Sequence, residues 1–209
     1  MFDVYAFATP NSIKVPIALE ELGLDYALHG INVRKGEQKA PDFVALNPNA
    51  KVPVLVDGGL VLTESAAILV YLAEKTGKFV PSDAAGRYQT LQWVMFQMTG
   101  VGPMFGQVGF FVKFAGKEID DPRPRQRYLD EAARLLGVIE QRLDGRKYMM
   151  GDDYTIADIA LWPWLRTING FYAAGELVRI GRFPRVLDYV KRCEERPASQ
   201  KAVNIPARG

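Results

Sequence analysis

Apolar and polar residues follow two different patterns in the first 80 residues of the chain. Some segments alternate between apolar and polar positions, as β-strands do, and others repeat apolar residues every three or four positions, as helices do. Strands are predicted at residues 2–7, which alternate, and at the apolar segments 28–33, 52–57 and 60–62, the last two joined by a glycine hairpin turn. The other segments predict helices at residues 17–22, 40–46 and 66–76, and Gly23 and Gly77 are typical helix ends. These elements together predict a compact α/β unit.

The remainder of the chain shows only helical spacing. Four segments carry apolar residues three and four positions apart: residues 87–99, 123–143, 156–172 and 184–196. The stretch at 79–86, which contains Pro81, Ser82 and Asp83, is typical of a linker. A chain of 209 residues is long enough for two domains. We therefore predict an α/β domain at residues 1–80, a linker at 81–86 and an all-α domain at 87–209.

A capping box is predicted at the start of the helix at 156–172, in the sequence Thr155-Ile156-Ala157-Asp158. In this motif the first side chain accepts a hydrogen bond from the helix backbone, and the acidic side chain reaches back to the N-cap. Its predicted role is structural, and loss of the Thr155 hydroxyl would cost about 1 kcal/mol. Pro163 removes one backbone donor inside the same helix and is expected to kink it.

The charge balance and hydropathy of the chain argue against nucleic-acid-binding and membrane-spanning proteins. The chain has 26 basic and 24 acidic residues without a block of either sign, which argues against a nucleic-acid-binding stripe. It contains no apolar run of membrane-spanning length and no leader pattern. We therefore expect a cytoplasmic protein that binds neither nucleic acid nor a membrane.

The chain is poor in the residues that usually carry chemistry. Its single cysteine, Cys193, excludes an internal disulfide, a Cys-x-x-Cys pair and a cysteine zinc cluster. Its single histidine, His29, argues against a histidine metal site or a Ser-His-Asp triad. Cys193 shares a helical face with apolar residues and is predicted to be part of the core. Any reactive group is therefore expected to come from a ligand.

The first strand leads directly into a polar segment, Thr9-Pro10-Asn11-Ser12, ahead of the first helix. Backbone N–H groups and the positive end of the helix dipole gather at such a junction, so a thiolate or carboxylate bound there would be stabilised without a metal. Threonine followed by proline is also the ordinary pattern of an N-cap. Pro16 lacks a backbone N–H group, which places the start of the regular helix no earlier than Ser12.

Two further motifs have both a structural and a functional interpretation. Pro53, at the start of a predicted strand, is either an ordinary edge-strand proline or a cis-proline that turns the backbone of Val52 towards a peptide-like ligand. Glu64 and Ser65 precede the helix at 66–76, where they cap the helix, bind a charged ligand, or do both.

The order of these motifs resembles that of the glutathione transferases. The resemblance rests on Thr9-Pro10-Asn11, on the sequence Asn-Pro-Asn-Ala-Lys-Val-Pro at 47–53, and on Leu-Thr-Glu-Ser at 62–65. The helical domain adds Tyr-Thr-Ile-Ala-Asp-Ile at 154–159. This resemblance covers essentially the whole chain and favours the cis-proline interpretation. It implies a thioredoxin-like domain followed by a helical-bundle domain, glutathione as cosubstrate, and a homodimer.

Shorter motifs resemble the Nu-class branch of that family, whose members reduce disulfides with glutathione. They are Thr9-Pro10-Asn11 and the sequences at 91–93, 102–107 and 159–164. The chain departs from the commoner Thr-Pro-Asn-Gly pattern at Ser12, where a side chain would add a donor or crowd a second thiol. The aromatic run at 105–114 would line an acceptor pocket or pack the domain junction.

The resemblance also implies roles for individual residues. Thr9 and Asn11 would donate hydrogen bonds to the glutathione sulfur and lower its thiol pKa by roughly one to two pH units, because a charge-assisted hydrogen bond contributes about 1.5 to 3 kcal/mol. Glu64 would bind the γ-glutamyl ammonium and Ser65 the γ-glutamyl carboxylate. The other implied contacts are Val52 with the adjoining Pro53 at the cysteinyl backbone, Gln38 and Lys51 at the glycyl carboxylate, and Arg127 at a second glutathione. Lys51 and Arg127 could also be ordinary solvated side chains.

Three functions are open on these grounds. In a glutathione-dependent disulfide reductase, a glutathione thiolate attacks a small disulfide and a second glutathione resolves the mixed disulfide. A conventional transferase would add the same thiolate to an electrophilic substrate, and a binding protein would keep the fold without turnover. The presence of Thr9, Asn11, Glu64 and Ser65 argues against loss of turnover. We predict the reductase.

Overall fold

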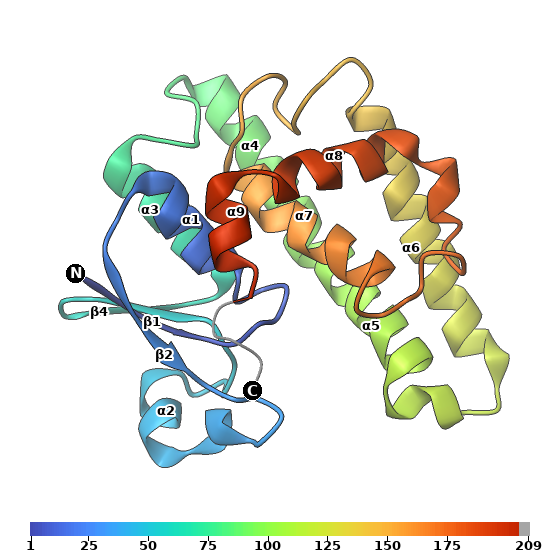
Figure 1. Cartoon of the computed structure of the whole chain (residues 1–209), viewed down its shortest axis with the longest axis horizontal. Coiled ribbons are helices and arrows are strands. Elements are labelled where there is room, and N and C mark those ends of the chain that lie inside the picture. Colours follow the sequence, from blue (N-terminus) through green and yellow to red (C-terminus); the bar gives the residue numbers. More distant parts are fainter. Residues whose placement is uncertain (205–209) are drawn as a thin grey trace. The chain divides into compact units, whose positions relative to one another are not determined.

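The computed structural model describes residues 1–204, and in it the chain forms two compact units (Figure 1). The first unit comprises Met1–Lys78 and the described residues from Glu195 on, and the second comprises Phe79–Glu194. The prediction instead assigned the last segment of the chain to the helical domain. The difference arises because α9 (Pro197–Ala202) packs against α1 (Lys14–Leu22) in the first unit.

Two ion pairs join this last segment to α1. The Arg196 guanidinium contacts the Glu21 carboxylate, with 2.7 Å between Nη2 and Oε2. The Lys201 Nζ lies 2.6 Å from Glu20 Oε2. A helix of six residues is too short to show the repeated spacing by which longer helices are recognised, so α9 was not predicted.

The first unit contains a mixed four-stranded sheet in the order β2-β1-β3-β4. Its strands are β1 (Phe2–Ala6), β2 (Tyr26–Gly30), β3 (Val54–Asp57) and β4 (Leu60–Thr63). β1 runs parallel to β2 and antiparallel to β3, and β3 is antiparallel to β4. The four predicted strands are confirmed, but β2 ends at Gly30 and not at Val33. Gly30 pairs with Ala6, the last residue of β1, so the sheet offers no further partner in β1.

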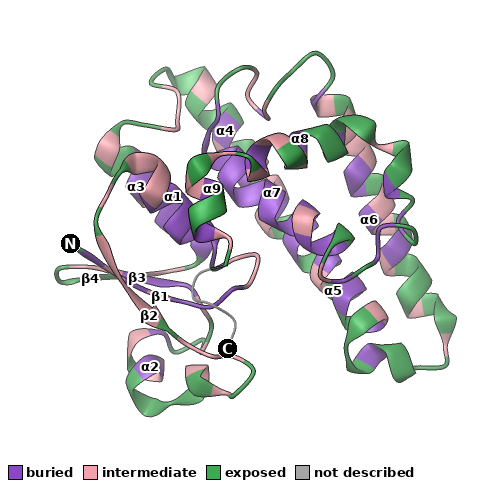
Figure 2. Ribbon diagram, in the orientation of Figure 1, coloured by how far each residue is buried: buried purple, intermediate pink, exposed green. Residues whose placement is uncertain are grey.

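Helices cover both faces of this sheet. Figure 1 shows α1 and α3 (Ser65–Thr76) on one face and α2 (Pro41–Leu46), which follows the short 3-10 helix η1 (Glu37–Lys39), on the other. Gly23 and Gly77 end α1 and α3 with φ of 67° and 66°, as predicted. The core between the sheet and the helices α1 and α3 is apolar and fully buried (Figure 2): Val4, Ala6, Ile17, Leu19, Leu55, Ile68 and Leu69.

The second unit is helical throughout its regular elements. They are α4 (Ala84–Phe96), the π-helical turn η2 (Gln97–Val101), α5 (Gly102–Lys113), η3 (Ala115–Glu118), α6 (Pro122–Arg142), α7 (Ile156–Asn169), η4 (Ile180–Arg182) and α8 (Pro184–Glu194). The four helices predicted here are confirmed, although α4 begins inside the predicted linker. α7 is buried along almost its whole length (Figure 2).

Helix α5 was not predicted because three glycines and a proline interrupt its sequence. One of these glycines has a packing role. A Cβ atom at Gly109 would overlap the ring of Tyr172, so only glycine lets the backbone of α5 approach this side chain. At Gly106, one turn away, the nearest side-chain atom would lie at an ordinary contact distance of 3.7 Å.

The predicted capping box is present at the start of α7. Thr155 Oγ1 accepts a hydrogen bond from the Ala157 N–H group, and Asp158 Oδ2 accepts one from the Thr155 N–H group at 2.8 Å. The other carboxylate oxygen of Asp158 accepts from the Met149 N–H group at 2.8 Å and from the Tyr189 hydroxyl at 3.0 Å. Asp158 is therefore a buried anchor for the loop before α7 and for α8, beyond its predicted role as a cap.

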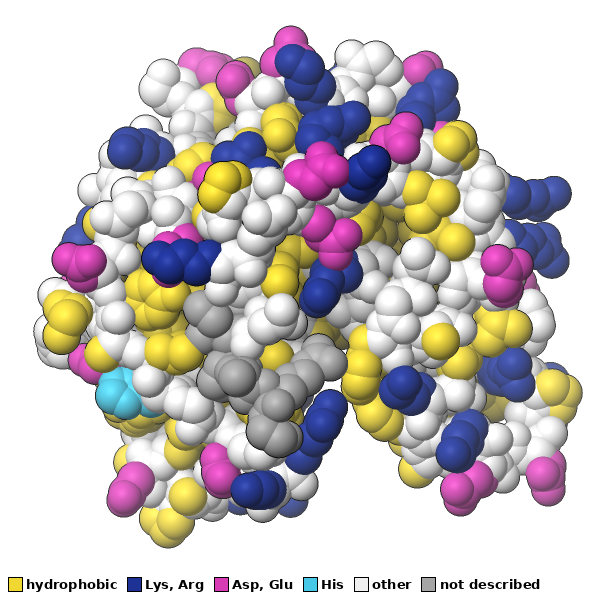
Figure 3. All heavy atoms as spheres, in the orientation of Figure 1, with side chains coloured by type: hydrophobic (Ala, Val, Ile, Leu, Met, Phe, Trp, Pro, Cys, Tyr) yellow, Lys and Arg dark blue, Asp and Glu magenta, His cyan; other side chains and the backbone are white. Residues whose placement is uncertain are grey.

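Cys193 is fully buried on α8, as predicted. On the face drawn in Figure 3, basic and acidic side chains are interspersed. Within residues 1–204, none of the helices combines the length and apolar character needed to cross a bilayer. The same residues contain no cluster of three histidine, cysteine or carboxylate side chains that could hold a metal ion.

Candidate functional site

A small pocket of about 130 Å³ lies in the first unit, where the turn after β1, the loop before β3 and the start of α3 meet. Its lining is mostly polar: Asn11, Asn47, Asn49, Lys51, Val52, Pro53, Glu64 and Ser65. Six of these eight residues were predicted from the sequence to bind glutathione. Asn47 and Asn49 were not, although the sequence Asn-Pro-Asn marks the loop that contains them.

The segment Thr9–Ile13 forms a turn, and the regular helix α1 begins at Lys14. This agrees with the expected effect of Pro16. The predicted cluster of available backbone donors is only partly present, because the N–H groups of Ser12 and Ile13 donate to the side-chain oxygen and the carbonyl of Thr9. Asn11, by contrast, is one of the residues that line the pocket.

Thr9 is positioned by a short network with Ser12. The Thr9 hydroxyl lies 3.0 Å from Ser12 Oγ, and its oxygen accepts from the Ser12 N–H group at 3.3 Å. Thr9 is nevertheless not the N-cap of α1, which is Ile13 and lacks a side-chain capping bond. Ser12 is fully buried and bonded to Thr9, and Thr9 itself is not part of the pocket lining.

A buried lysine behind the pocket was missed by the sequence analysis. Lys14 is fully buried, and its Nζ lies 2.8 Å from Asn11 Oδ1 and 3.3 Å from Ser65 Oγ. Burial lowers the pKa of Lys14 from 10.5 to about 7, while the charge of Glu64 acts in the opposite direction. The sequence did contain an indication that Lys14 is buried. Lys14 precedes the buried residues Ile17 and Ala18 by three and four positions, and residues with this spacing share one face of a helix.

The loop before β3 is held by Asn47. Its side-chain amide donates to the Lys51 carbonyl at 2.6 Å, and its side-chain oxygen accepts from the Asn49 N–H group at 3.0 Å. The peptide bond between Val52 and Pro53 is cis, as the motif resemblance predicted. These contacts bring the backbone around Val52 to the pocket.

At the start of α3 the prediction of a side-chain cap is wrong. Ser65 is the first residue of the helix, and Glu64, at the N-cap, makes no side-chain capping bond. The Ser65 hydroxyl faces Lys14 instead. Glu64 has a φ of 65°, in the left-handed region that costs a residue with a side chain about 1 to 3 kcal/mol and that is common at functional sites.

Gln38 and Arg127 lie outside this pocket. Gln38 is on η1, and its Oε1 atom is buried without a hydrogen-bond partner among residues 1–204. Arg127 is an exposed residue of α6 in the second unit, where it lines a separate open cavity of about 420 Å³ with Met104, Tyr128 and Glu131.

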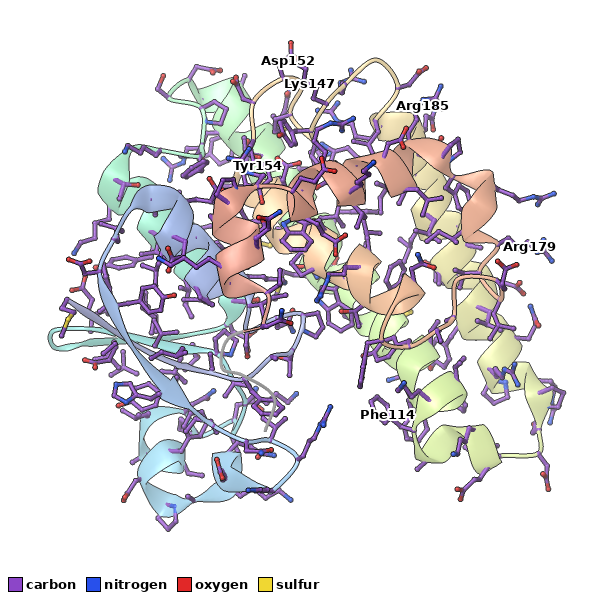
Figure 4. The ribbon with its side chains drawn as sticks, in the orientation of Figure 1. Phe114, Lys147, Asp152, Tyr154, Arg179 and Arg185 are labelled. Carbon is purple, nitrogen blue, oxygen red and sulfur yellow. The ribbon has the colours of Figure 1, made fainter. Side chains whose placement is uncertain are left out.

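The aromatic run at 105–114 divides between core and surface. Phe105 and Phe111 are buried in the second unit, and the Phe111 ring stacks on Tyr128 with 5.5 Å between centroids. Phe110 is 40% exposed, and Phe114, labelled in Figure 4 just beyond the end of α5, is 46% exposed. Two of the aromatic side chains are thus core residues, and the other two reach the surface.

Two family models match the chain: the glutathione S-transferase N-terminal domain at residues 2–74 and the glutathione S-transferase C-terminal domain at residues 109–192. The chain belongs to the glutathione S-transferase family. The predicted fold class, a thioredoxin-like domain followed by a helical domain, is thereby confirmed. This transferase is 40% identical over 210 residues to the disulfide-bond oxidoreductase YfcG of Escherichia coli, covering 97% of this chain and 94% of that protein.

Solved structures of similar transferases contain glutathione. One from Burkholderia graminis, with two glutathione molecules bound per subunit, is 54% identical with a TM-score of 0.96, covering 100% of this chain and 89% of that one. Another from Pseudomonas putida, with one glutathione disulfide bound per subunit, is 48% identical with a TM-score of 0.96, covering 98% and 91%.

Proposed function

We propose that this transferase is a glutathione-dependent disulfide oxidoreductase that binds glutathione in the pocket of its first unit. The observation that carries the proposal is the pocket itself, which gathers Asn11, Val52, Glu64 and Ser65 from three distant parts of the chain. The names of similar proteins support it, since YfcG and YghU of Escherichia coli are both disulfide-bond oxidoreductases. The bound glutathione in the similar structures supports the choice of cosubstrate.

The chemistry follows from the source of the thiol. The only cysteine of the chain is buried in the second unit, so the protein offers no reactive thiol of its own. The thiolate of one glutathione attacks a sulfur of the disulfide, forms a mixed disulfide and releases the other sulfur as a thiolate. A second glutathione thiolate attacks the glutathione sulfur of that mixed disulfide, releasing the second thiol and glutathione disulfide. Two glutathione molecules thus supply both electrons.

Thr9 and Asn11 are the residues that we assign to the glutathione sulfur. Asn11 is among the residues that line the pocket, which supports its role as a donor. The Thr9 hydroxyl is bonded to Ser12, and because two hydroxyls can exchange donor and acceptor roles, Ser12 can donate to Thr9 while Thr9 donates to the sulfur. Hydrogen bonds of this kind favour the thiolate over the thiol.

The other contacts are proposed for the same ligand. Glu64 and Ser65 would bind the γ-glutamyl ammonium and carboxylate, and Val52 beside Pro53 the cysteinyl backbone. Lys51 lines the pocket in a position suited to the glycyl carboxylate. For Gln38 and Arg127 the support is the motif resemblance alone.

A two-substrate assay tests the function. Glutathione is supplied with either bis(hydroxyethyl) disulfide or chlorodinitrobenzene, and glutathione disulfide or the aryl conjugate is measured. We expect turnover of the disulfide to exceed that of the aryl halide. Faster conjugation would favour a conventional transferase, and no turnover of either substrate would favour a binding role, as the name of the similar yeast protein "Transcriptional regulator URE2" suggests for that protein.

A pH-rate profile tests the assignment of Asn11. Asn11→Ala should slow disulfide reduction at neutral pH, and much of the lost rate should return as pH rises and the bound thiol ionises without help. A profile with an unchanged midpoint and a lower maximum would mean that Asn11 positions the ligand without activating its sulfur. Cys193→Ser is the matched control and should keep the profile of the parent.

Cellular location and assembly are also part of the proposal. A chain with one buried cysteine and a requirement for reduced glutathione suits the cytoplasm, where thiols are kept reduced. A homodimer is proposed from the motif resemblance. Light scattering coupled to size exclusion tests it, since a dimer has twice the 23.3 kDa mass of the chain.

A further inference from the structure

Lys14 lies behind the pocket and not in its lining. The side chain is fully buried, yet two of the residues that its ammonium contacts, Asn11 and Ser65, line the pocket. These two residues are 54 positions apart in the sequence, at two different corners of the site. One buried lysine therefore connects the corner assigned to the glutathione sulfur with the corner assigned to its γ-glutamyl carboxylate.

The hydrogen-bonding capacity of lysine determines how these neighbours are oriented. In its charged form the Lys14 amino group only donates, and the Asn11 atom that lies 2.8 Å from it is the side-chain oxygen. The Asn11 NH₂ group then points away from Lys14. Ser65 Oγ likewise accepts from Lys14, so its own hydrogen also points away from the ammonium. Lys14 thereby disfavours the flipped amide, which would present its oxygen to the pocket and repel a thiolate.

We propose that Lys14 is a positioning residue of the glutathione site, which fixes the Asn11 amide with its NH₂ group towards the pocket and supplies positive charge behind Ser65 for an anionic ligand. This inference rests on the proposed function. It adds to that function a residue that touches no ligand and acts through two residues that do. The ligand group that it favours is a carboxylate held by Ser65.

Other charged groups of the described residues lie near Lys14 or elsewhere along α1. Glu64, at the start of α3, is the acidic group that acts on Lys14. Arg196, just before α9, and Lys201, on α9, pair with Glu21 and Glu20 at the opposite end of α1. A carboxylate bound at Ser65 would therefore add negative charge next to an ammonium that burial has made easy to deprotonate.

Proton uptake on binding is the expected signature. Because burial lowers the pKa of Lys14 to about 7, most of this side chain is neutral at pH 8 in the ligand-free protein. A nearby anion favours the charged form, so ligand binding should raise this pKa and draw a proton from the buffer. A side chain with only a structural role would not couple ligand binding to proton uptake.

The experiment is calorimetric titration of the full chain with S-methylglutathione, whose sulfur cannot ionise, at pH 8 in two buffers with different ionisation enthalpies. The parent should take up a substantial fraction of a proton. Lys14→Met should take up less and bind about tenfold more weakly or worse. Lys39→Met removes an exposed lysine at the end of η1 and should match the parent in both respects.

A second variant covers the case in which Lys14→Met does not fold, as judged by circular dichroism. Lys14→Gln keeps a donor without a charge, and it should lose proton uptake while retaining more affinity than methionine gives. Parent-like affinity and proton uptake in a folded Lys14 variant would overturn the inference. If the parent itself does not bind S-methylglutathione, the proposed function fails, independently of Lys14.

Discussion

Replacing Lys14 by methionine keeps an unbranched side chain in a fully buried position and removes its ammonium group. In the native protein, burial lowers the pKa of Lys14 from 10.5 to about 7. Unfolding returns the side chain to water, so between pH 7 and pH 10.5 the unfolded chain holds this proton more tightly than the native protein does. Stability therefore rises with pH across this window, and the whole penalty of burying the charge is present below pH 7.

The pKa difference sets the size of the effect. At 1.36 kcal/mol per pH unit, the difference between 10.5 and about 7 corresponds to a penalty of about 5 kcal/mol below pH 7. About 2 kcal/mol of this penalty should be relieved between pH 7 and pH 9. Methionine does not titrate, so Lys14→Met should lack this part of the pH dependence. The variant also lacks the hydrogen bonds from Lys14 to Asn11 and Ser65, which changes its free energy of unfolding by a similar amount at every pH.

Urea unfolding at pH 7, 8 and 9 measures the difference. Far-UV circular dichroism is the suitable signal, because all three tryptophans lie in the second unit and Lys14 lies in the first. Lys39→Met should follow the parent. If the free energies of unfolding of the parent and of Lys14→Met run parallel from pH 7 to pH 9, Lys14 does not titrate in this range and the reasoning is wrong.

Three further predictions concern the second unit. Gly109→Ala should lower the free energy of unfolding by about 1 to 3 kcal/mol, because the added methyl group would overlap Tyr172. Gly106→Ala on the same helix should not lower it. Urea unfolding of the two variants tests this, and equal effects would contradict the packing argument. Asp158→Ala should lower the free energy of unfolding by about 3 kcal/mol or more, because it leaves buried N–H and hydroxyl donors without an acceptor. A decrease below about 1 kcal/mol in the same assay would show that these donors find other partners. Cys193→Ser should lower the free energy of unfolding by about 1 kcal/mol, because it buries a hydroxyl group. The rate of disulfide reduction should stay within a small factor of the parent's. Loss of this activity in a folded variant would make Cys193 a candidate nucleophile.

Local signals made much of the fold predictable. The capping box at Thr155 and the helix ends at Gly23 and Gly77 follow from short-range rules and were found at the predicted residues. α5 was missed because its glycines argue locally against a helix, and the reason for one of them is a contact with Tyr172, more than sixty residues later in the chain. Such a reason cannot be read from neighbouring residues.

The candidate site was also predictable only in part. Asn11, Val52 and Glu64 were predicted to be near one another from the order of motifs, and all of them line the pocket. Lys14 was missed because lysine is rarely buried, so its polar character outweighed its position on the buried face of α1. The left-handed backbone at Glu64 was not predicted either, since that region is unusual for glutamate.

Because α9 belongs to the first unit although it lies at the end of the chain, the first unit cannot fold completely until synthesis is almost finished. The second unit is, in effect, an insertion between two pieces of the first, so the first unit lacks its last helix until the chain is almost complete. At about 5 to 20 residues per second, a ribosome needs on the order of ten seconds to add the intervening roughly 120 residues. Throughout that interval Glu20 and Glu21 have no access to Lys201 and Arg196. A nascent chain arrested before Arg196 should therefore expose the α9-binding face of α1 to chaperones and proteases, and release of the last segment should close it.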